Sequence, residues 1–230
     1  MKIVFSAICG CLFLLPFTLP AQTKAGADTI NIFTLGDSNG TFPWSWPQQF
    51  KWALPNTRVF NISKSGRTIG FVNNGDSTLN SLLVIDENLR KAAANAKERP
   101  FDFIVLQLGT NDAKAVFAGR QHEVPQNLDR LIKTIRNCPY SSISRAKIIV
   151  IAPPPYGAKA ISTEKYAGGD KRVQDMSTAF EKVAKQNNCL FVNGWATPQL
   201  DINAMTPDGL HLDSTASRKL IDPVVKLIRN

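Results

Sequence analysis

Residues 29–40 read Thr-Ile-Asn-Ile-Phe-Thr-Leu-Gly-Asp-Ser-Asn-Gly, a β-forming run that ends in a polar turn between two glycines. Apart from Asn31, the first seven residues are aliphatic, aromatic or β-branched, which is typical of a buried strand. Gly36 and Gly40 let the backbone bend sharply directly after this strand. The stretch therefore predicts a strand whose end presents the hydroxyl of Ser38.

Similar apolar runs recur further along the chain and alternate with helical patterns. The expected strands are 29–35, 57–62, 102–108, 147–152 and 189–193. The expected helices are 46–53, 77–96, 125–137, 170–187 and 214–228. This alternation predicts an α/β protein with repeated βα units, in which a mostly parallel sheet of five strands is covered on both faces as a three-layer sandwich.

The first 21 residues differ from the rest of the chain. Lys2 is followed by an almost uncharged apolar run from Ile3 to Leu19 and then by Pro20-Ala21-Gln22. This pattern predicts a secretory signal peptide that is cleaved near Ala21. A membrane anchor is the alternative, but the run of about 17 residues is short for a bilayer and lacks a basic flank.

Composition and charge limit the class of protein further. The 230 residues are 43% hydrophobic and 20% charged, which favours a globular protein over a disordered chain or a membrane bundle. We expect residues 22–230 to form one exported domain, periplasmic or extracellular, without stable membrane insertion after cleavage. The net charge of +9 is scattered and accompanies no nucleic-acid motif, so we expect no nucleic acid as partner, whereas an anionic substrate stays open.

Two cysteines remain after the predicted leader, Cys138 and Cys189, and each follows a predicted helix. Both could lie at the same end of the sheet, and an exported protein can keep a disulfide. A bridge between them is one alternative and two buried free thiols are the other. Two isolated cysteines do not predict a metal site.

Polar segments follow the second and third predicted strands. Asn-Ile-Ser-Lys-Ser-Gly occupies 61–66, and Gly-Thr-Asn-Asp occupies 109–112. The carboxyl ends of parallel strands meet at one edge of a sheet, so these segments are expected near Ser38. The N–H groups of Ser38 and Gly66 and the side-chain amide of Asn111 could stabilise an oxyanion in acyl transfer. A turn-forming asparagine is the alternative for Asn111.

A histidine near the C-terminus supplies a candidate base. Asp208-Gly-Leu-His211 stands directly before the last predicted helix. A serine hydroxyl needs a base, imidazole has a suitable pKa, and a carboxylate bonded to Nδ1 leaves Nε2 free to face the hydroxyl. Alone, the pattern could be a helix cap with a surface histidine. With Ser38, Gly66 and Asn111 upstream, we predict a catalytic set of Ser38, Asp208 and His211.

These four blocks, at 36–38, 66, 109–112 and 208–211, resemble in order and placement those of the SGNH (GDSL) hydrolase family. The resemblance implies a flavodoxin-like three-layer fold, no metal or cofactor, and ester hydrolysis with an oxyanion hole made by Ser38, Gly66 and Asn111. The stretch 109–117 and the later Ala-Pro-Pro-Pro at 152–155 also resemble the aryl-esterase and acyltransferase branch. Asn39 departs from the leucine that many members carry.

Several residues near the blocks are candidates for substrate contacts. They are Asn39, Trp44, Trp46, Arg67, Lys114 and Tyr156. The aromatic rings could stack on a sugar or line an acyl pocket, and the cations could meet an anionic or acetylated glycan. Loop packing for the rings and solvation for the charges are the alternatives.

The sequence as a whole predicts a secreted serine esterase that removes short acyl groups, such as acetyl from carbohydrate, through an acyl-Ser38 intermediate. The expected partner is a small-molecule or polysaccharide ester. One alternative is an aryl-ester or lipid-directed esterase with acyltransferase capacity. Another is a non-catalytic glycan-binding module on the same fold. The oligomeric state stays open.

Overall fold

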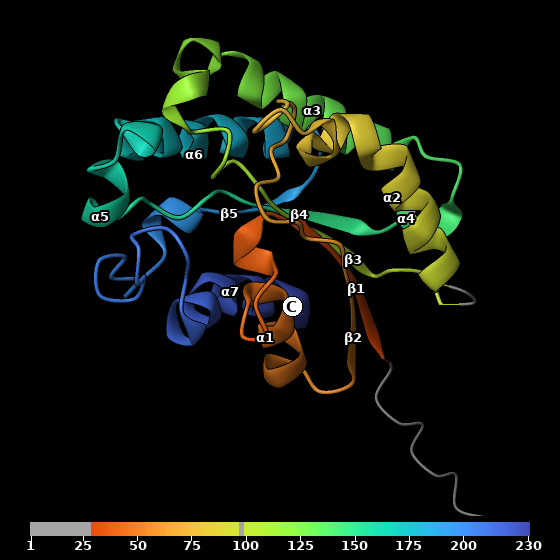
Figure 1. Cartoon of the computed structure of the whole chain (residues 1–230). Helices are drawn as coiled ribbons and strands as arrows, with labels where there is room; N and C mark the ends of the chain where they lie inside the picture. Colours follow the sequence, from red (N-terminus) through yellow and green to blue (C-terminus); the bar gives the residue numbers. More distant parts are fainter. Residues whose placement is uncertain (1–28, 97–98) are drawn as a thin grey trace, which may run out of the picture.

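The computed structural model describes residues 29–96 and 99–230, and a parallel five-stranded sheet lies at its centre (Figure 1). The predicted signal peptide lies outside the described residues. The strands are β1 (Ile30–Gly36), β2 (Thr57–Asn61), β3 (Phe103–Gln107), β4 (Lys147–Ile151) and β5 (Leu190–Val192). Their order in the sheet is β2-β1-β3-β4-β5, and every neighbouring pair is parallel. Each lies within a residue or so of its prediction.

Helices lie between successive strands, and a last helix follows β5. The α-helices are α1 (Trp46–Ala53), α2 (Ser81–Ala96), α3 (Glu123–Arg136), α4 (Ser141–Ser144), α5 (Ala158–Ile161), α6 (Gly169–Gln186) and α7 (Ser214–Arg229). Short 3-10 turns are η1 (Ser38–Gly40), η2 (Ser77–Leu79), η3 (Ala115–Arg120), η4 (Glu164–Tyr166) and η5 (Gly194–Ala196). The short helices α4 and α5 were not predicted, because four residues carry too little periodicity to detect.

One predicted helix, 77–96, is wrong at its start. The structure has the separate turn η2 there, capped by the Asp76 side chain, and α2 begins only at Ser81. Between them Asn80 is extended, with ψ near 111°. The Ser81 hydroxyl donates to the carbonyl of Thr68, which ties the start of α2 to a distant loop that periodicity does not reveal.

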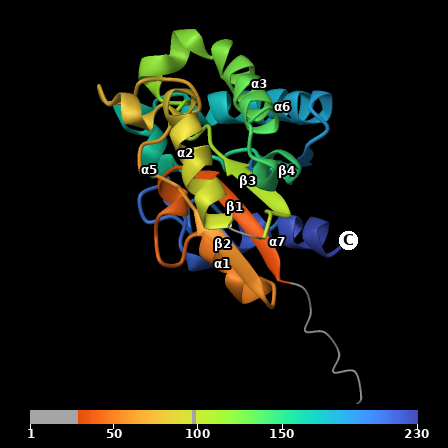
Figure 2. The same ribbon diagram turned by 90° about the vertical axis from the view of Figure 1, so that its right-hand side faces the viewer.

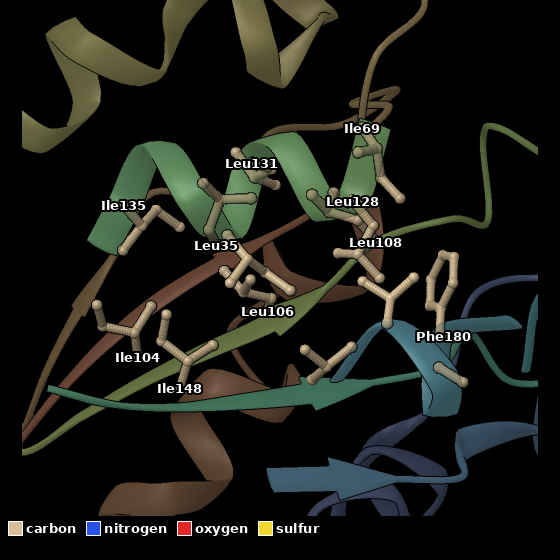
Figure 3. Close-up of a cluster of buried hydrophobic side chains, with 14 of the residues drawn as sticks. Leu35, Ile69, Ile104, Leu106, Leu108, Leu128, Leu131, Ile135, Ile148 and Phe180 are labelled. Atoms are coloured by element: carbon tan, nitrogen blue, oxygen red, sulfur yellow. The ribbon is translucent and has the colours of Figure 1, made fainter. Parts of the chain in front are cut away.

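The sheet is covered on both faces, so the molecule has three layers (Figure 2). α2, α3 and α6 lie on one face and α1 and α7 on the other. Side chains of β3 alternate between the two cores: Ile104 and Leu106 belong to the first, and Val105 to the second. Figure 3 shows Leu128, Leu131 and Ile135 of α3 pointing onto the sheet. The predicted three-layer α/β/α fold is confirmed.

The topology places the loops that matter for function at one edge. β1 lies between β2 and β3. The chain therefore moves from β1 to one neighbour first and then returns past β1 to add the remaining strands on its other side. Ligands of such sheets bind outside the carboxyl ends of the strands at this reversal. Gly36 at the end of β1 pairs in register with Gln107 at the end of β3. The segments that carry Ser38 and Asn111 therefore leave the sheet as neighbours.

The two cysteines form no disulfide in the structure. Cys138 and Cys189 are both free and half-buried. Each thiol turns to its own local turn, Cys138 toward the carbonyl of Tyr140 and Cys189 toward that of Asn187. Burial raises the pKa of the Cys189 thiol, which disfavours its reactive thiolate form.

Candidate active site

The first part of the site is the turn after β1. The Asp37 carboxylate accepts the N–H of Asn39 at 2.9 Å and so caps the 3-10 turn that holds Ser38. Gly40 ends this turn, and a Cβ there would lie 2.1 Å from the Ser63 hydroxyl, so only glycine fits. The short cap and the glycine together hold the Ser38 side chain at the carboxyl edge of the sheet.

The second part is the turn before α7. One oxygen of Asp208 accepts the N–H groups of Leu210 and His211, at 2.9 Å and 2.8 Å. The other lies 2.6 Å from Nδ1 of His211. Gly209 has φ of +79°, and its close approach to the backbone of Ala160 leaves no room for a side chain. Asp208 therefore orients both the backbone and the ring of His211.

The two parts meet at Ser38. Nε2 of His211 lies 2.9 Å from the Ser38 hydroxyl oxygen, across 173 positions of sequence. With Nδ1 facing a carboxylate, Nε2 is the nitrogen available to accept the hydroxyl proton. Partial burial opposes ionisation of Asp208, but hydrogen bonds from His211 and Leu210 outweigh it, and its pKa is lowered. The structure thus brings the three predicted catalytic residues into one hydrogen-bonded chain.

Asn39 lies between these two parts and joins them. It is 1% exposed, its amide donates to the carbonyl of Leu210 at 3.3 Å, and its carbonyl accepts the N–H of Leu212 at 2.9 Å. Both partners flank His211. Since its side chain is buried among backbone groups, the predicted role of Asn39 as a substrate contact is wrong, and the residue instead fastens the histidine loop to the serine turn.

The predicted oxyanion donors belong to two further loops. Gly66 has φ of +80°, a conformation that favours glycine, and lines the same pocket as Ser38 and Asn111. The Asn111 amide donates one hydrogen to the carbonyl of Arg67 at 3.1 Å, which leaves its second N–H for a ligand. The loop that carries Gly66 is therefore positioned partly by Asn111 itself.

Two neighbours of Asn111 also hold this loop. The Asp112 carboxylate accepts the N–H of Ile69 at 2.9 Å. Nζ of Lys114 donates to Oδ1 of Asn73 at 3.0 Å, and the Asn73 amide donates to the carbonyl of Gly66 at 2.6 Å. Asn111, Asp112 and Lys114 thus anchor the loop that carries Gly66 at three points.

Buried charges lie beneath the site. Burial raises the pKa of Asp112 to about 7, with the N–H groups of Ile69 and Gly70 opposing the shift and the charge of Asp37 adding to it. Burial also raises the pKa of Asp37, against the opposing hydrogen bond from Asn39. Burial and the charge of Lys165 lower the pKa of Lys114 to about 8. Neutralisation of buried acids and bases is the expected response to loss of hydration.

The pocket around Ser38 has a volume of about 390 Å³. Its lining consists of Ser38, Phe42, Ser65, Gly66, Asn74, Asn111, Lys114, Lys165, Tyr166, Leu210 and His211. Phe42 meets the His211 ring edge-on at 5.6 Å, and the exposed Trp44 stacks on Phe42 at 5.3 Å. A larger cavity of about 630 Å³ beside α2 and α3 is lined by Cys138 but by none of the predicted catalytic, oxyanion or substrate-contact residues.

Three further predicted substrate contacts are buried away from this pocket. Trp46 is fully buried in the core with α1 and α7. The buried guanidinium of Arg67 donates to the carbonyl of Ile62. The Tyr156 hydroxyl donates to the carbonyl of Thr110. These predictions are wrong because each of the three side chains is buried inside the protein. Lys114 does line the pocket. Trp44 does not line it, but it stacks on Phe42, which does.

Lys165 and Tyr166 line the pocket but were not predicted as site residues. Both come from η4, a turn between α5 and α6 that has no strand directly before it and no motif. Tyr156, which the sequence did single out, lies behind Tyr166, with ring centroids 5.4 Å apart. An aromatic residue was therefore expected in the right region, but the ring that lines the pocket is ten positions further along.

Within residues 29–96 and 99–230, no three His, Cys, Asp or Glu side chains group as metal ligands. Over the same described ranges, no helix is long and apolar enough to span a bilayer.

A serine, an imidazole and a carboxylate in series, at the carboxyl edge of a three-layer sandwich, is an arrangement that serine hydrolases use. Residues 26–219 match the family of GDSL-like lipases and acylhydrolases, and the chain belongs to this family. It is accordingly an ester-hydrolysing enzyme. No curated protein sequence matches the chain.

Solved structures share the fold. The carbohydrate acetylesterase Est24 from Sinorhizobium meliloti has a TM-score of 0.74 at 19% identity, covering 87% of this chain and 99% of that one. The native aryl esterase of M. smegmatis has a TM-score of 0.73 at 19% identity, with the same coverage. A catalytic mutant of Axe2, an acetylxylan esterase from Geobacillus stearothermophilus, has 0.61 at 15% identity, covering 86% and 94%. At these identities the likeness establishes the fold.

Proposed function

We propose that this enzyme hydrolyses short-chain carboxylic esters, with O-acetyl groups on carbohydrate as its natural substrate, through an acyl-Ser38 intermediate. The observation that carries the proposal is the series of contacts from Asp208 through His211 to Ser38, at 2.6 Å and 2.9 Å. Both distances are within the reach of proton transfer. Ser38 is the nucleophile, His211 the base, and Asp208 the group that orients it.

Acylation begins when the Ser38 oxygen attacks the ester carbonyl while Nε2 of His211 takes its proton. The carbonyl oxygen becomes an oxyanion, and it receives hydrogen bonds from the N–H groups of Ser38 and Gly66 and the Asn111 amide. Such donors are worth about 2.7–4 kcal/mol each in transition-state energy. The intermediate collapses, the alcohol leaves with the proton from His211, and the acyl group stays on Ser38.

Deacylation repeats these steps with water. His211 removes a proton from a water molecule, the hydroxide attacks the acyl-Ser38 carbonyl, and the same donors stabilise the second oxyanion. Collapse then releases the carboxylic acid and returns the proton to Ser38.

The lining of the pocket supports a short acyl group. Phe42 and Leu210 are its purely apolar side chains, and most of the rest are hydroxyl, amide or charged groups. A long acyl chain needs a continuous apolar surface, because each buried methylene contributes about 0.8 kcal/mol only in an apolar environment.

Carbohydrate as the alcohol part is supported by the aromatic pair beside the pocket. Trp44 remains 41% exposed while it stacks on Phe42, so one of its faces can meet a sugar ring. The S. meliloti carbohydrate acetylesterase and the Geobacillus acetylxylan esterase share the fold.

The apolar leader at 1–21 supports export to a compartment where polysaccharides occur. N-terminal sequencing of protein recovered outside the cytoplasm should start at Gln22, and recovery of intact Met1 would contradict export.

Turnover of p-nitrophenyl acetate by wild type and Ser38→Ala tests the chemistry. We expect the variant to lose the activity almost completely while keeping its melting temperature, and a retained wild-type rate would refute the assignment.

Labelling by a fluorophosphonate probe separates an enzyme from a glycan-binding module. A profile of acyl chain lengths separates acetyl esters from lipid or aryl esters, since a preference for long chains would contradict the acetylesterase.

A further inference from the structure

Two lysines and no acidic side chain line the pocket around Ser38. Lys114 follows β3 and Lys165 belongs to η4 after β4, so the two cations come from separate loops of the same sheet edge. Neither has a role in the proposed chemistry, because proton transfer and oxyanion binding are supplied by other groups. Lys114 helps to hold the glycine loop through Asn73, but that contact uses only one of its three N–H donors, so the charges of the two lysines still need an explanation.

Lys114 is a buried cation with no carboxylate of the described chain in direct contact, and the buried Asp112 and Asp37 raise its pKa less than burial and Lys165 lower it. The residue is 3% exposed, and its ammonium group donates to Oδ1 of Asn73. Among the described residues, no carboxylate lies within 4.0 Å of its ammonium group. An ammonium group has three N–H donors, and buried charges are ordinarily paired. Donors of Lys114 are therefore left for a group that enters the pocket.

Lys165 adds a second charge from the solvent side. It is exposed, and its ammonium lies 5.3 Å from the centre of the Tyr166 ring. Its charge is close enough to Lys114 to lower the pKa of that residue. Two cations that repel each other across a pocket favour an anion between them, since an anion would be attracted by both.

We propose that Lys114 and Lys165 form a subsite for a carboxylate carried by the substrate, so that the preferred substrates are esters of acidic molecules such as acetylated uronic acids. This proposal rests on the proposed function and defines its substrate class. The carboxylate can belong to the sugar that leaves or to the acyl group that is transferred. The recognition is the same, because both place one negative charge beside the ester.

Matched pairs of substrates test the proposal and locate the carboxylate. Acetylated glucuronic acid is compared with acetylated glucuronamide, and p-nitrophenyl hydrogen succinate with p-nitrophenyl butyrate. In each pair, charge is the main difference. We expect kcat/KM to favour the acid by about tenfold in at least one pair, and the preference to shrink in about 0.5 M salt. The pair that shows the preference identifies the side of the ester that carries the charge.

Variants connect this preference to the two lysines. Lys165→Gln should lower the acid-to-neutral ratio by about two- to fivefold, as for an exposed ion pair, and Lys165→Glu should lower it further. Lys114→Met should lower it by about tenfold or more, because its charge is buried. Lys182→Gln on α6 removes an exposed lysine outside the pocket and should leave the ratio unchanged.

The possible results distinguish failure of the carboxylate subsite from failure of the proposed esterase function. Turnover of p-nitrophenyl acetate that depends on Ser38, with no preference for the acid in either pair, would overturn the subsite alone. A preference for the acid that persists in both Lys165 variants would also overturn the subsite. Neither variant disturbs the contact between Lys114 and Asn73. Absence of ester turnover altogether would remove the proposed function and the subsite together.

Discussion

The side-chain carbonyl of Asn39 accepts the backbone N–H of Leu212, 173 positions away, at 2.9 Å. Together with the bond from the Asn39 amide to Leu210, this contact holds the residues on either side of His211. The residue next to the predicted nucleophile therefore fixes the position of the predicted base. The distance from His211 to Ser38 depends on an amide that touches neither reacting atom.

Asn39→Leu removes both bonds while keeping a side chain of similar size. We expect kcat for p-nitrophenyl acetate to fall by about tenfold or more, because misplacement of a catalytic group by 1 Å can cost about 10²-fold. Two backbone groups would also lose their buried partner, at about 1–3 kcal/mol of stability each. Turnover of p-nitrophenyl acetate at saturating substrate measures the effect on kcat, and urea unfolding measures the effect on stability. A variant with wild-type kcat would show that the loop holds His211 without this clamp.

Asp208→Asn and His211→Ala distinguish the orienting group from the base. Removing His211 leaves no base, so a loss of about 10⁶ in kcat is expected. Replacing Asp208 by Asn keeps the base but favours the wrong tautomer, for which about 10⁴ is expected. Rates at saturating substrate give both numbers. Equal losses would contradict the separate roles assigned to the two residues.

Gly66→Ala and Gly75→Ala form a matched pair in the same loop. Both glycines have positive φ, +80° and +73°, so both variants should lose about 1–2 kcal/mol of stability from backbone strain. Gly66 lines the pocket, whereas a Cβ on Gly75 meets nothing within 4 Å. Alanine keeps the backbone N–H, but its Cβ would lie 3.1 Å from Cδ1 of Leu79, so we expect the Gly66 N–H to be displaced from the oxyanion and kcat to fall by about 10-fold or more in Gly66→Ala alone. A similar fall in both would mean that loop strain, and not the Gly66 N–H, controls the rate.

Asp112 should make stability depend on pH. Its pKa of about 7 in the folded protein exceeds the value of 3.8 expected when unfolded, so between about pH 4 and pH 7 the native state holds a proton that the unfolded chain has lost. The free energy of unfolding should therefore fall as pH rises through this window and level off above it, with a slope approaching about 1.4 kcal/mol per pH unit.

Asp112→Asn keeps the shape and has no such proton, so the difference in unfolding free energy between wild type and variant isolates the effect. Urea unfolding at several pH values measures it. Parallel curves for the two proteins would refute the raised pKa.

The sequence predicted the parts of the site that lie directly after strands or within a local turn. Ser38, Asn111 and the pair Asp208–His211 could be found because each belongs to a short pattern whose geometry is set within a few residues. The wrong predictions concern side chains whose direction depends on how the chain folds around them. Arg67, Tyr156 and Trp46 turn inward, each for a contact that their neighbours in sequence do not reveal.

By itself, the sequence determined the five strands and their layers, because the pattern of apolar residues decides which segments must be buried and on which face. It also determined the kind of chemistry at the sheet edge, through the residue types that follow the strands. Tertiary structure alone decided that Asn39 faces backbone and not substrate, that Lys165 joins Lys114, and that Cys138 and Cys189 stay apart. These outcomes depend on contacts between segments far apart in the chain, whose distances follow only from the packing of the whole.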